Sequence, residues 1–523
     1  MKHLALALLG AVLAASCATP TREQNLVNRA VEAMGGAERL AGIKTIAFKG
    51  GAKYWEPEQS DAPGGEERFA NETSFEGIID AASRSSRTDN VRNFAYPSPR
   101  TFTFSEVVTP EAGYVIGVDS NGRNAQNLKS NPPAHSMSGV RLATSQREAR
   151  RGGTAALMLA MHRSPERVQA AADINGQPAA SFDGFLVAFD PTTGLPSRVR
   201  TLDYDNIWGD VTYDMVVSDW REVGGVKIPM SRRYELNGRR VSEVNLSEVR
   251  YNQPVDTARL QIPAEVRAGA AKPATRNVPY QWVIRRQFIG TYMDSDNLSY
   301  DTRGSQGLRL QEVAPGVHQV QGGTHNSLVV EMSDHLIVLD APVTDAQSLW
   351  LVGQTRARFP GKPIRWLALT HHHMDHAGGL RGILAEGGVT LVVGQGAGAH
   401  FRRVLEAPTT RNPDMPARSY HMVPILEVPE SHVMSDSTGR QVIVYVMMDN
   451  PHAKGMLLGW VPHAKLGFVT DVWTPGPPLP AKPNPGLASV VSTVKRAGLQ
   501  PDRFAGGHGG TADYQMLARL VGQ

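Results

Sequence analysis

The chain contains 523 residues, of which 41% are hydrophobic and 20% are charged, and its formal net charge is +4. This length exceeds what one hydrophobic core usually serves, so we expect at least two folded domains of ordinary globular composition. Because lysine and arginine are scattered rather than gathered in a basic stripe, the charge pattern argues against a nucleic-acid partner.

The first 20 residues, MKHLALALLGAVLAASCATP, have the pattern of a signal peptide. Lys2 and His3 precede an apolar run, residues 4–15, that is too short to span a bilayer comfortably. The run ends in AASC, which resembles the lipobox of bacterial lipoproteins, although alanine stands where leucine is commoner. The resemblance implies removal of residues 1–16, a lipid on Cys17 and anchoring on the periplasmic side, at the outer membrane. The alternative is a soluble, secreted periplasmic protein. Cys17 is the only cysteine, so neither alternative allows an internal disulfide.

Residues 18–263 are predicted to form a β-rich domain. An amphipathic helix at Glu23–Met34 ends at Gly35-Gly36, since glycine readily takes the left-handed conformation that terminates helices. Segments of alternating or β-rich sequence follow, separated by turn residues, with one helix predicted near Thr154–Ala172. The pattern predicts a curved antiparallel sheet or half-barrel. Phrases such as AVEAMGGAERLAGIKTIAFKG resemble periplasmic lipoprotein-sorting-carrier domains, which implies an apolar ligand; a purely structural or docking role is the alternative.

Residues 264–307 are rich in alanine, arginine, asparagine, serine and glycine, and we predict a linker there. From residue 308 to 523 short apolar strands such as IRWLALT and VTLVVG alternate with helical stretches such as AQSLWLVGQTRARF and LASVVSTVKRAG. This alternation favours layered α/β packing.

The stretch LALTHHHMDHAGGL, residues 367–380, holds four histidines and an aspartate within six positions. Side chains two apart in an extended chain point the same way, so His371 and His373 are expected to face one metal ion. Asp375 and His376, where the chain turns into a helix, are expected to reach a second point a few ångströms away. His372 and Met374 are expected to pack away from the site. The spacing therefore predicts two metal ions.

Three further polar residues follow apolar strands. They are His452 in DNPHAKGM, Asp471 at the end of LGFVTD and His508 in FAGGHGG. Sites in α/β folds are built just past strand ends, although each of these residues alone would be an ordinary loop or turn residue.

Taken together, THHHMDHAGG and these three residues resemble the T-H-x-H-x-D-H-x-G-G signature of the metallo-β-lactamase superfamily, over about residues 308–523. The resemblance implies an αβ/βα sandwich with two zinc ions at one edge, although other divalent metals are possible. The first ion would be held by His371, His373 and His452, and the second by Asp375, His376 and His508, with Asp471 bridging both. Asp340, at a strand end, would orient a ligand histidine; its alternative is a turn residue.

The implied chemistry is hydrolysis. A water between two cations loses a proton near neutral pH and attacks a carbonyl, while a cation stabilises the oxyanion. Asp375 would orient the hydroxide and is the one residue for which we predict a catalytic role. We expect an extracytoplasmic hydrolase of a small-molecule ester, lactone, thioester or amide.

Several alternatives stay open. Asp471 stands where many true β-lactamases of the superfamily carry cysteine or serine, which disfavours a β-lactam substrate. Sulfatase or phosphodiesterase activity could use the same site. A mononuclear-iron redox enzyme similar to persulfide dioxygenases could keep much of the ligand set. The chain could also be a lipid- or partner-binding lipoprotein with a vestigial hydrolase domain. No residue is assigned to substrate binding.

Overall fold

The structure, a computed structural model, describes residues 19–119, 134–273, 307–411, 420–478 and 480–522. The predicted signal peptide and Cys17 lie outside the described residues, as does most of the predicted linker. Among the described residues, no helix combines the length and the apolar composition that a bilayer crossing requires.

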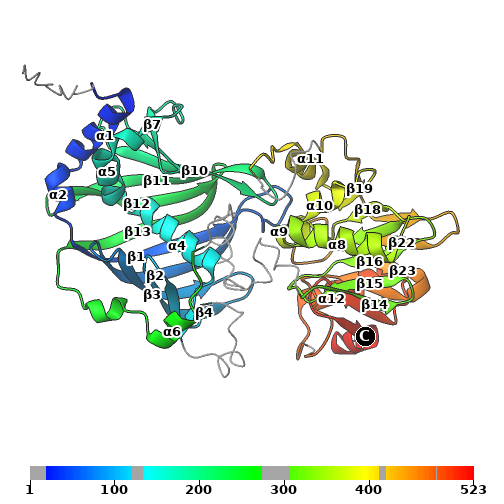
Figure 1. The fold of residues 1–523 in the computed structure, drawn as a ribbon. Helices are drawn as coiled ribbons and strands as arrows, with labels where there is room; N and C mark the ends of the chain where they lie inside the picture. The colour runs from blue at the N-terminus through cyan, green and yellow to red at the C-terminus, as the bar shows by residue number, and fades with distance from the viewer. Residues whose placement is uncertain (1–18, 120–133, 274–306, 412–419, 479, 523) are drawn as a thin grey trace, which may run out of the picture.

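The N-terminal part is built on one antiparallel sheet of 13 strands (Figure 1). The strands are β1 (Thr45–Glu56), β2 (Arg68–Asp80), β3 (Ser85–Phe94), β4 (Arg100–Val108), β5 (Gly113–Gly117), β6 (Ala134–Ser136), β7 (Gln169–Ala170), β8 (Ala179–Phe182), β9 (Phe185–Phe189), β10 (Pro196–Asp205), β11 (Gly209–Val223), β12 (Val226–Leu236) and β13 (Arg239–Tyr251). Their order is β6-β5-β4-β3-β2-β1-β13-β12-β11-β10-β9-β8-β7. The predicted antiparallel, β-rich region is confirmed.

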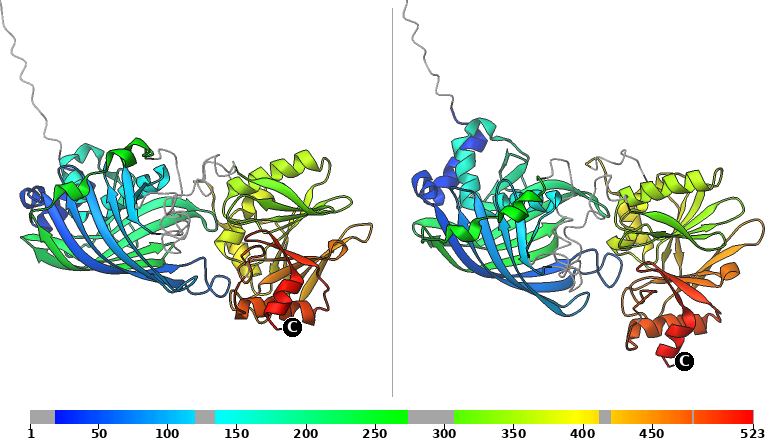
Figure 2. Two further views of the ribbon diagram at one scale, coloured as in Figure 1. Left: turned by 90° about the horizontal axis from the view of Figure 1, so that it is seen from below. Right: turned by 60° about the horizontal axis from the view of Figure 1, so that its bottom comes forward.

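Helices cover one side of this sheet (Figure 2). They are α1 (Arg22–Ala33), α2 (Ala37–Ala41), α4 (Gly139–Gly152), α5 (Thr154–Arg163) and α6 (Ala264–Ala268), with 3₁₀ turns η1 (Pro165–Arg167) and η2 (Thr257–Leu260). Helix α1 begins at the capping box that Thr21 forms with Gln24, close to the predicted start. The helix predicted at Thr154–Ala172 ends earlier, at Arg163, because Pro165 opens a 3₁₀ turn.

Helix α4 was not predicted, because its buried face carries arginines instead of an apolar stripe. Arg141 pairs at 2.7 Å with Glu106 of β4, and Arg151 donates at 2.6 Å to Thr201 of β10. Strands β4 and β10 lie far apart in the sheet order, so the sheet must curl around α4 to reach both. Ion pairs and hydrogen bonds therefore occupy the space between α4 and the sheet. The apolar ligand predicted for this domain stays a prediction.

The predicted linker begins with helix α6, which packs its Val266 against Val107 and Tyr114 of the N-terminal sheet. Residues 274–306 of that segment lie outside the described residues.

The C-terminal part contains two sheets packed face to face. The seven-stranded sheet runs in the order β14 (Arg309–Ala314), β15 (Val317–Gln321), β16 (Leu328–Glu331), β17 (Leu336–Leu339), β18 (Ile364–Ala368), β19 (Thr390–Gly394) and β20 (Ile425–Val428). The six-stranded sheet runs in the order β21 (Ser431–Ser435), β22 (Gln441–Val446), β23 (Leu457–Val461), β24 (Leu466–Val469), β25 (Arg503–Gly506) and β26 (Thr511–Asp513). Both sheets are mixed, since β17 to β20 pair in parallel, as do β24 and β25.

Helices cover the outer faces of both sheets. The helices are α8 (Asp345–Arg358), α9 (Met374–Ala377), α10 (Leu380–Leu384), α11 (Gly398–Glu406), α12 (Pro485–Arg496) and α13 (Tyr514–Leu520), with the 3₁₀ turn η5 (Pro462–Ala464). One apolar core joins the two sheets, for example Leu339 with Phe468. A second core lies between the first sheet and its helices, and a third lies under α12 and α13. These four layers agree with the predicted αβ/βα sandwich.

Two connections of the N-terminal sheet contact the C-terminal domain. In the β10–β11 turn, Ile207 is fully buried in the C-terminal core. Arg381 donates to the carbonyls of Asn206 at 2.6 Å and Ile207 at 2.9 Å. The other connection, residues 57–67 between β1 and β2, reaches the C-terminal domain as the blue segment in Figure 2.

Candidate metal centre

The histidine-rich stretch begins where β18 ends and turns into helix α9 at the N-cap residue His373. The turn needs the glycine pair that follows α9. A Cβ atom on Gly379 would lie 2.2 Å from Oγ of Ser348 and 2.6 Å from the carbonyl oxygen of Thr344. Any larger residue would push α9 away from helix α8. The glycines therefore allow the histidine-rich stretch to pack closely against α8.

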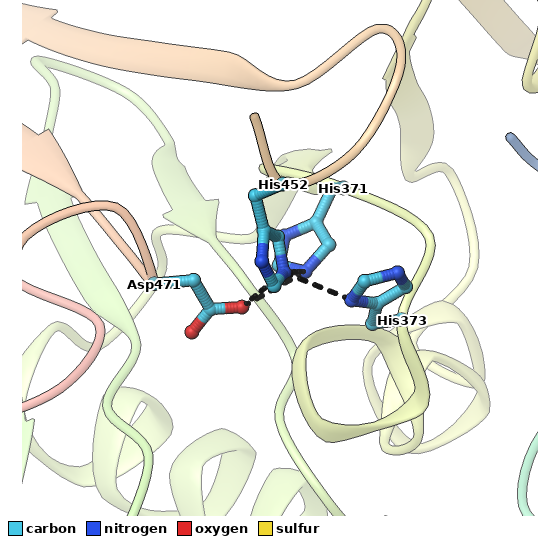
Figure 3. A group of neighbouring side chains, drawn as sticks. All are labelled: His371, His373, His452 and Asp471. Atoms are coloured by element: carbon cyan, nitrogen blue, oxygen red, sulfur yellow. Dashed lines mark hydrogen bonds and ion pairs between the residues drawn. The ribbon is translucent and has the colours of Figure 1, made fainter. Parts of the chain in front are cut away.

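The first set of ligand atoms comes from four residues in three segments (Figure 3). Nε2 of His452 lies 3.2 Å from Nε2 of His371 and 3.0 Å from Nδ1 of His373. Oδ2 of Asp471 lies 2.8 Å from Nε2 of His452 and 3.1 Å from Nε2 of His371. The structure thus brings together the predicted first set, His371, His373 and His452. One oxygen of Asp471, the predicted bridging carboxylate, lies beside them.

These separations fit a metal ion. Two nitrogens bound to a tetrahedral zinc at about 2.0–2.1 Å lie roughly 3.3 Å apart. Three imidazole nitrogens and one carboxylate oxygen therefore converge on one point. A cation at that point would bind these atoms and stabilise their close approach.

The second set lies on the other oxygen of Asp471. Oδ1 of Asp471 is 2.5 Å from Nε2 of His508 and 3.2 Å from Nε2 of His376. Asp375 offers a carboxylate oxygen within 4.8 Å of the ligand atoms of His376 and Asp471. The predicted second set is thus split between two groups that share His376, one with Asp375 and Asp471 and the other with His508 and His325. Asp471 lies between these groups and the first set.

His508 is placed by a tight turn after β25. The amide of Gly507 donates at 2.8 Å to the carbonyl of Val469, the last residue of β24. A Cβ atom on Gly507 would lie 2.6 Å from Oγ1 of Thr470. Glycine therefore allows the backbone before His508 to lie directly against the strand end that carries Asp471.

Asp340 lies at the end of β17 and contacts a predicted ligand. Its Oδ2 is 3.0 Å from Nδ1 of His376, and both side chains are fully buried. Its carboxylate also accepts from the amide of Thr370 at 2.6 Å. This contact leaves Nε2 of His376 as the atom that faces Asp471, as expected of a residue that orients a ligand histidine.

The pKa shifts show what charge the site demands. Burial acts to lower the pKa of His376, but Asp471 and Asp340 outweigh it and hold this pKa well above its usual range. Burial, together with the neighbouring His376, lowers the pKa of His371 to about 3. Burial alone would raise the pKa of Asp471, yet His376 and His452 hold it well below its usual range. His371 is therefore neutral and Asp471 is ionised, as metal ligands must be, whereas His376 holds a proton beside two carboxylates. A cation bound at Asp471 would take the place of that proton.

His325 is a candidate ligand that the sequence did not suggest. Its Nε2 lies 3.2 Å from Oδ2 of Asp375, and it groups with His376 and His508 within 4.8 Å. It lies in GGTHNSLVV, just before β16, where no spacing pattern marks it as a ligand. Only its position beside two other histidines identifies it.

His372 and Met374 lie outside these sets. Met374 packs into the core under α8, and Nε2 of His372 lies 2.9 Å from the carbonyl oxygen of Ser60.

Comparison with known proteins matches residues 320–512 to the sequence model of the Metallo-beta-lactamase superfamily. No curated protein matches the chain. Among solved structures, the chain is similar to the stereoselective inverting sec-alkylsulfatase Pisa1 from a Pseudomonas species, with 17% identity and a TM-score of 0.32. That match covers 41% of this chain and 41% of the alkylsulfatase.

Two metallo-β-lactamase structures match over a similar share of this chain. The enzyme from Pontibacter korlensis is 15% identical, with a TM-score of 0.31, over 41% of this chain and 97% of its own. FIM-1 from Pseudomonas aeruginosa, in its mono-zinc form, is 17% identical, with a TM-score of 0.31, over 41% of this chain and 93% of its own. The histidine and aspartate sets, which run from His325 to His508, lie within the region that the family model matches. The C-terminal part of the chain therefore contains a metallo-β-lactamase superfamily domain with a candidate histidine–aspartate metal site.

Proposed function

We propose that the chain is a zinc-dependent hydrolase that cleaves a small-molecule ester, lactone, thioester or amide. The observation that carries this proposal is the position of Asp471, whose two oxygens face two separate sets of imidazole nitrogens. Mixed imidazole and carboxylate sets suit zinc, and two sets that share a carboxylate suit a pair of ions.

Metal ions held by these residues would lower the pKa of a coordinated water and polarise the scissile carbonyl. Asp375 would orient the attacking water, because its carboxylate stays ionised. Burial opposes that ionisation, but His325 and His376 hold the pKa of Asp375 well below its usual range. His371, His373 and His376 are buried, so bulk water is kept from these nitrogens and every charge interaction among them is strengthened.

We also propose that the protein acts on the periplasmic side, anchored by a lipid on Cys17. The support is the N-terminal sequence alone. Labelling with a fatty-acid probe in a Gram-negative host tests it: labelled wild type beside unlabelled Cys17→Ala is expected, and an unlabelled wild type would favour the soluble alternative.

The activity is tested with the chain from residue 19 and a panel of lactones, aryl esters, thioesters, β-lactams, sulfate esters and phosphodiesters. Hydrolysis of a carbonyl substrate is expected, with loss of activity on chelation and in His373→Ala. His463→Ala, which changes an exposed histidine, is the matched control. A zinc-loaded protein that leaves all carbonyl substrates intact would contradict the proposal. A single bound iron with oxygen uptake would favour the redox alternative.

A further inference from the structure

We propose that the β1–β2 connection of the N-terminal domain is part of the metal centre, where Gln59 positions Asp375 and the carbonyl of Ser60 positions His373. This inference rests on the proposed metal site but does not depend on the reaction. It assigns to the N-terminal domain a defined role, which is to set the affinity and geometry of the metals held 316 residues later in the chain.

Gln59 holds the carboxylate of Asp375 through a directed hydrogen-bond chain. Nε2 of Gln59 donates to Oδ1 of Asp375 at 2.7 Å. The hydroxyl of Tyr96 donates to Oε1 of Gln59 at 2.6 Å. Because the ionised carboxylate of Asp375 can only accept, Nε2 of Gln59 faces it, and Oε1 is left to accept from the hydroxyl of Tyr96. Gln59 is only 3% exposed, so few other orientations are open to it.

His325 meets the other oxygen of the same carboxylate. With Oδ1 of Asp375 taken by Gln59 and Oδ2 3.2 Å from Nε2 of His325, the plane of the carboxylate is defined from both sides. Each oxygen keeps a second lone pair, so a carboxylate held in this way can still bind a cation. It loses no rotamer freedom on binding, which raises affinity.

Ser60 selects the tautomer of His373. Its carbonyl oxygen lies 2.9 Å from Nε2 of His373 and can only accept, so His373 carries its proton on Nε2. The lone pair is then on Nδ1, the atom that faces His452 at 3.0 Å. A backbone carbonyl behind a ligand histidine is a recurrent way to fix the orientation of the ring.

The connection is anchored on both sides of His452. Arg68 donates to the carbonyl of His452 at 3.0 Å and lies over the ring of Tyr96, with 4.6 Å from its guanidinium carbon to the ring centroid. The amide of Lys454 donates to the carbonyl of Asp61 at 2.8 Å. These contacts hold the connection against the same loop that supplies a ligand, so Gln59 and Ser60 keep their positions.

The test uses the full chain from residue 19 and three variants: Gln59→Met, Tyr96→Phe and their combination. Methionine keeps the length of the side chain and removes the amide donor. Zinc affinity of each site is measured by competition with a chromophoric chelator, and ligand geometry by the visible spectrum of the cobalt-substituted protein. Glu66→Ala, an exposed residue of the same connection, is the matched control.

Gln59→Met is expected to weaken the weaker of the two zinc sites by about 10–100-fold and to alter the cobalt spectrum, while Glu66→Ala changes neither. Tyr96→Phe is expected to act in the same direction and less strongly. Since both residues act through one hydrogen-bond chain, the double variant should lose no more affinity than Gln59→Met alone. Thermal melting of each variant confirms that it is folded.

Wild-type zinc affinities and an unaltered cobalt spectrum in folded Gln59→Met would overturn the inference. If Gln59→Met does not fold, Tyr96→Phe decides, since it removes a single hydroxyl. These readouts need no substrate. A wild type that binds two zincs but hydrolyses nothing would sink the proposed function and leave this inference standing. If the wild type is active and Gln59→Met binds zinc with wild-type affinity, the proposed function stands and this inference fails.

Discussion

Oδ2 of Asp340 lies 3.0 Å from Nδ1 of His376, and neither side chain is exposed. Asp340 adopts a left-handed backbone conformation, with φ of 62°, which asparagine also tolerates. Asp340→Asn should therefore fold, but it removes the charge that supports the basicity of His376. We expect zinc affinity at the second set to fall by about 10–100-fold, measured by chelator competition. Unchanged affinity would show that Asp340 is only a turn residue.

Asp471→Asn should reduce the occupancy of both metal sets, because each oxygen of this carboxylate faces a different set. Asparagine suits the left-handed φ of 56° at this position. Zinc per chain, measured by atomic emission, should fall from two toward zero. Asp449→Asn, at an exposed aspartate, should keep both ions. Two retained ions in Asp471→Asn would refute a shared carboxylate.

His325→Phe should weaken only the second set, since His325 groups with His376 and His508 and not with His371. Phenylalanine keeps a ring at the position and removes its nitrogens. We expect about one tightly bound zinc per chain after gel filtration, with the second ion lost at lower chelator concentration than in the wild type. Equal loss of both ions would mean that the variant disturbs the fold around the site.

His400 is expected to make the protein less stable in mild acid. Burial, with His372 nearby, lowers the pKa of His400 to about 3, from an ordinary value of 6.5. Between these values the unfolded chain takes up a proton that the folded chain refuses, so stability falls as pH drops below about 6.5. At pH 5 this group alone should cost about 2 kcal/mol.

This cost is measured by urea unfolding of chelated protein at pH 7.5 and pH 5. In His400→Phe the loss of stability between these pH values should be smaller by about 2 kcal/mol. Other buried histidines contribute equally to both proteins and cancel in the comparison. An identical loss in wild type and variant would show that His400 is protonated when folded.

Arg381→Met should loosen the junction between the two parts of the chain. Arg381 is only 2% exposed and donates to the carbonyls of Asn206, Ile207 and Val404. Losing these charge-assisted bonds leaves buried carbonyls unpaired, which should cost about 2–5 kcal/mol in urea unfolding. Arg356→Met, which breaks an exposed pair with Glu386, should cost under about 1 kcal/mol. An equal loss of unfolding free energy in the two variants would mean that Arg381 does not stabilise the junction.

Local sequence was enough to predict much of the candidate metal centre. Alternation along an extended chain assigned His371 and His373 to one set, and the turn at the glycines assigned Asp375 and His376 to another. These relationships span a few residues, so backbone geometry alone decides them. The same holds for helix α1, whose start follows from the capping box at Thr21.

Other features depend on contacts that no local pattern encodes. Helix α4 was not predicted, because a helix face that carries arginines is expected to face solvent. Arg141 and Arg151 are instead buried, held by ion pairs and hydrogen bonds. His325 became a candidate ligand only when β16 placed it beside His508.

The sequence by itself determined the expectation of two metal ions at His371–His376, because spacing and side-chain chemistry are local properties. The roles predicted for His452, Asp471 and His508 came from the family resemblance of the motif. Only the tertiary structure decided that His325 joins His376 and His508 and that Gln59 meets Asp375 across 316 residues. Contacts of that range depend on how the two parts of the chain dock, and docking is set by buried groups such as Ile207 and Arg381 that look ordinary in the sequence.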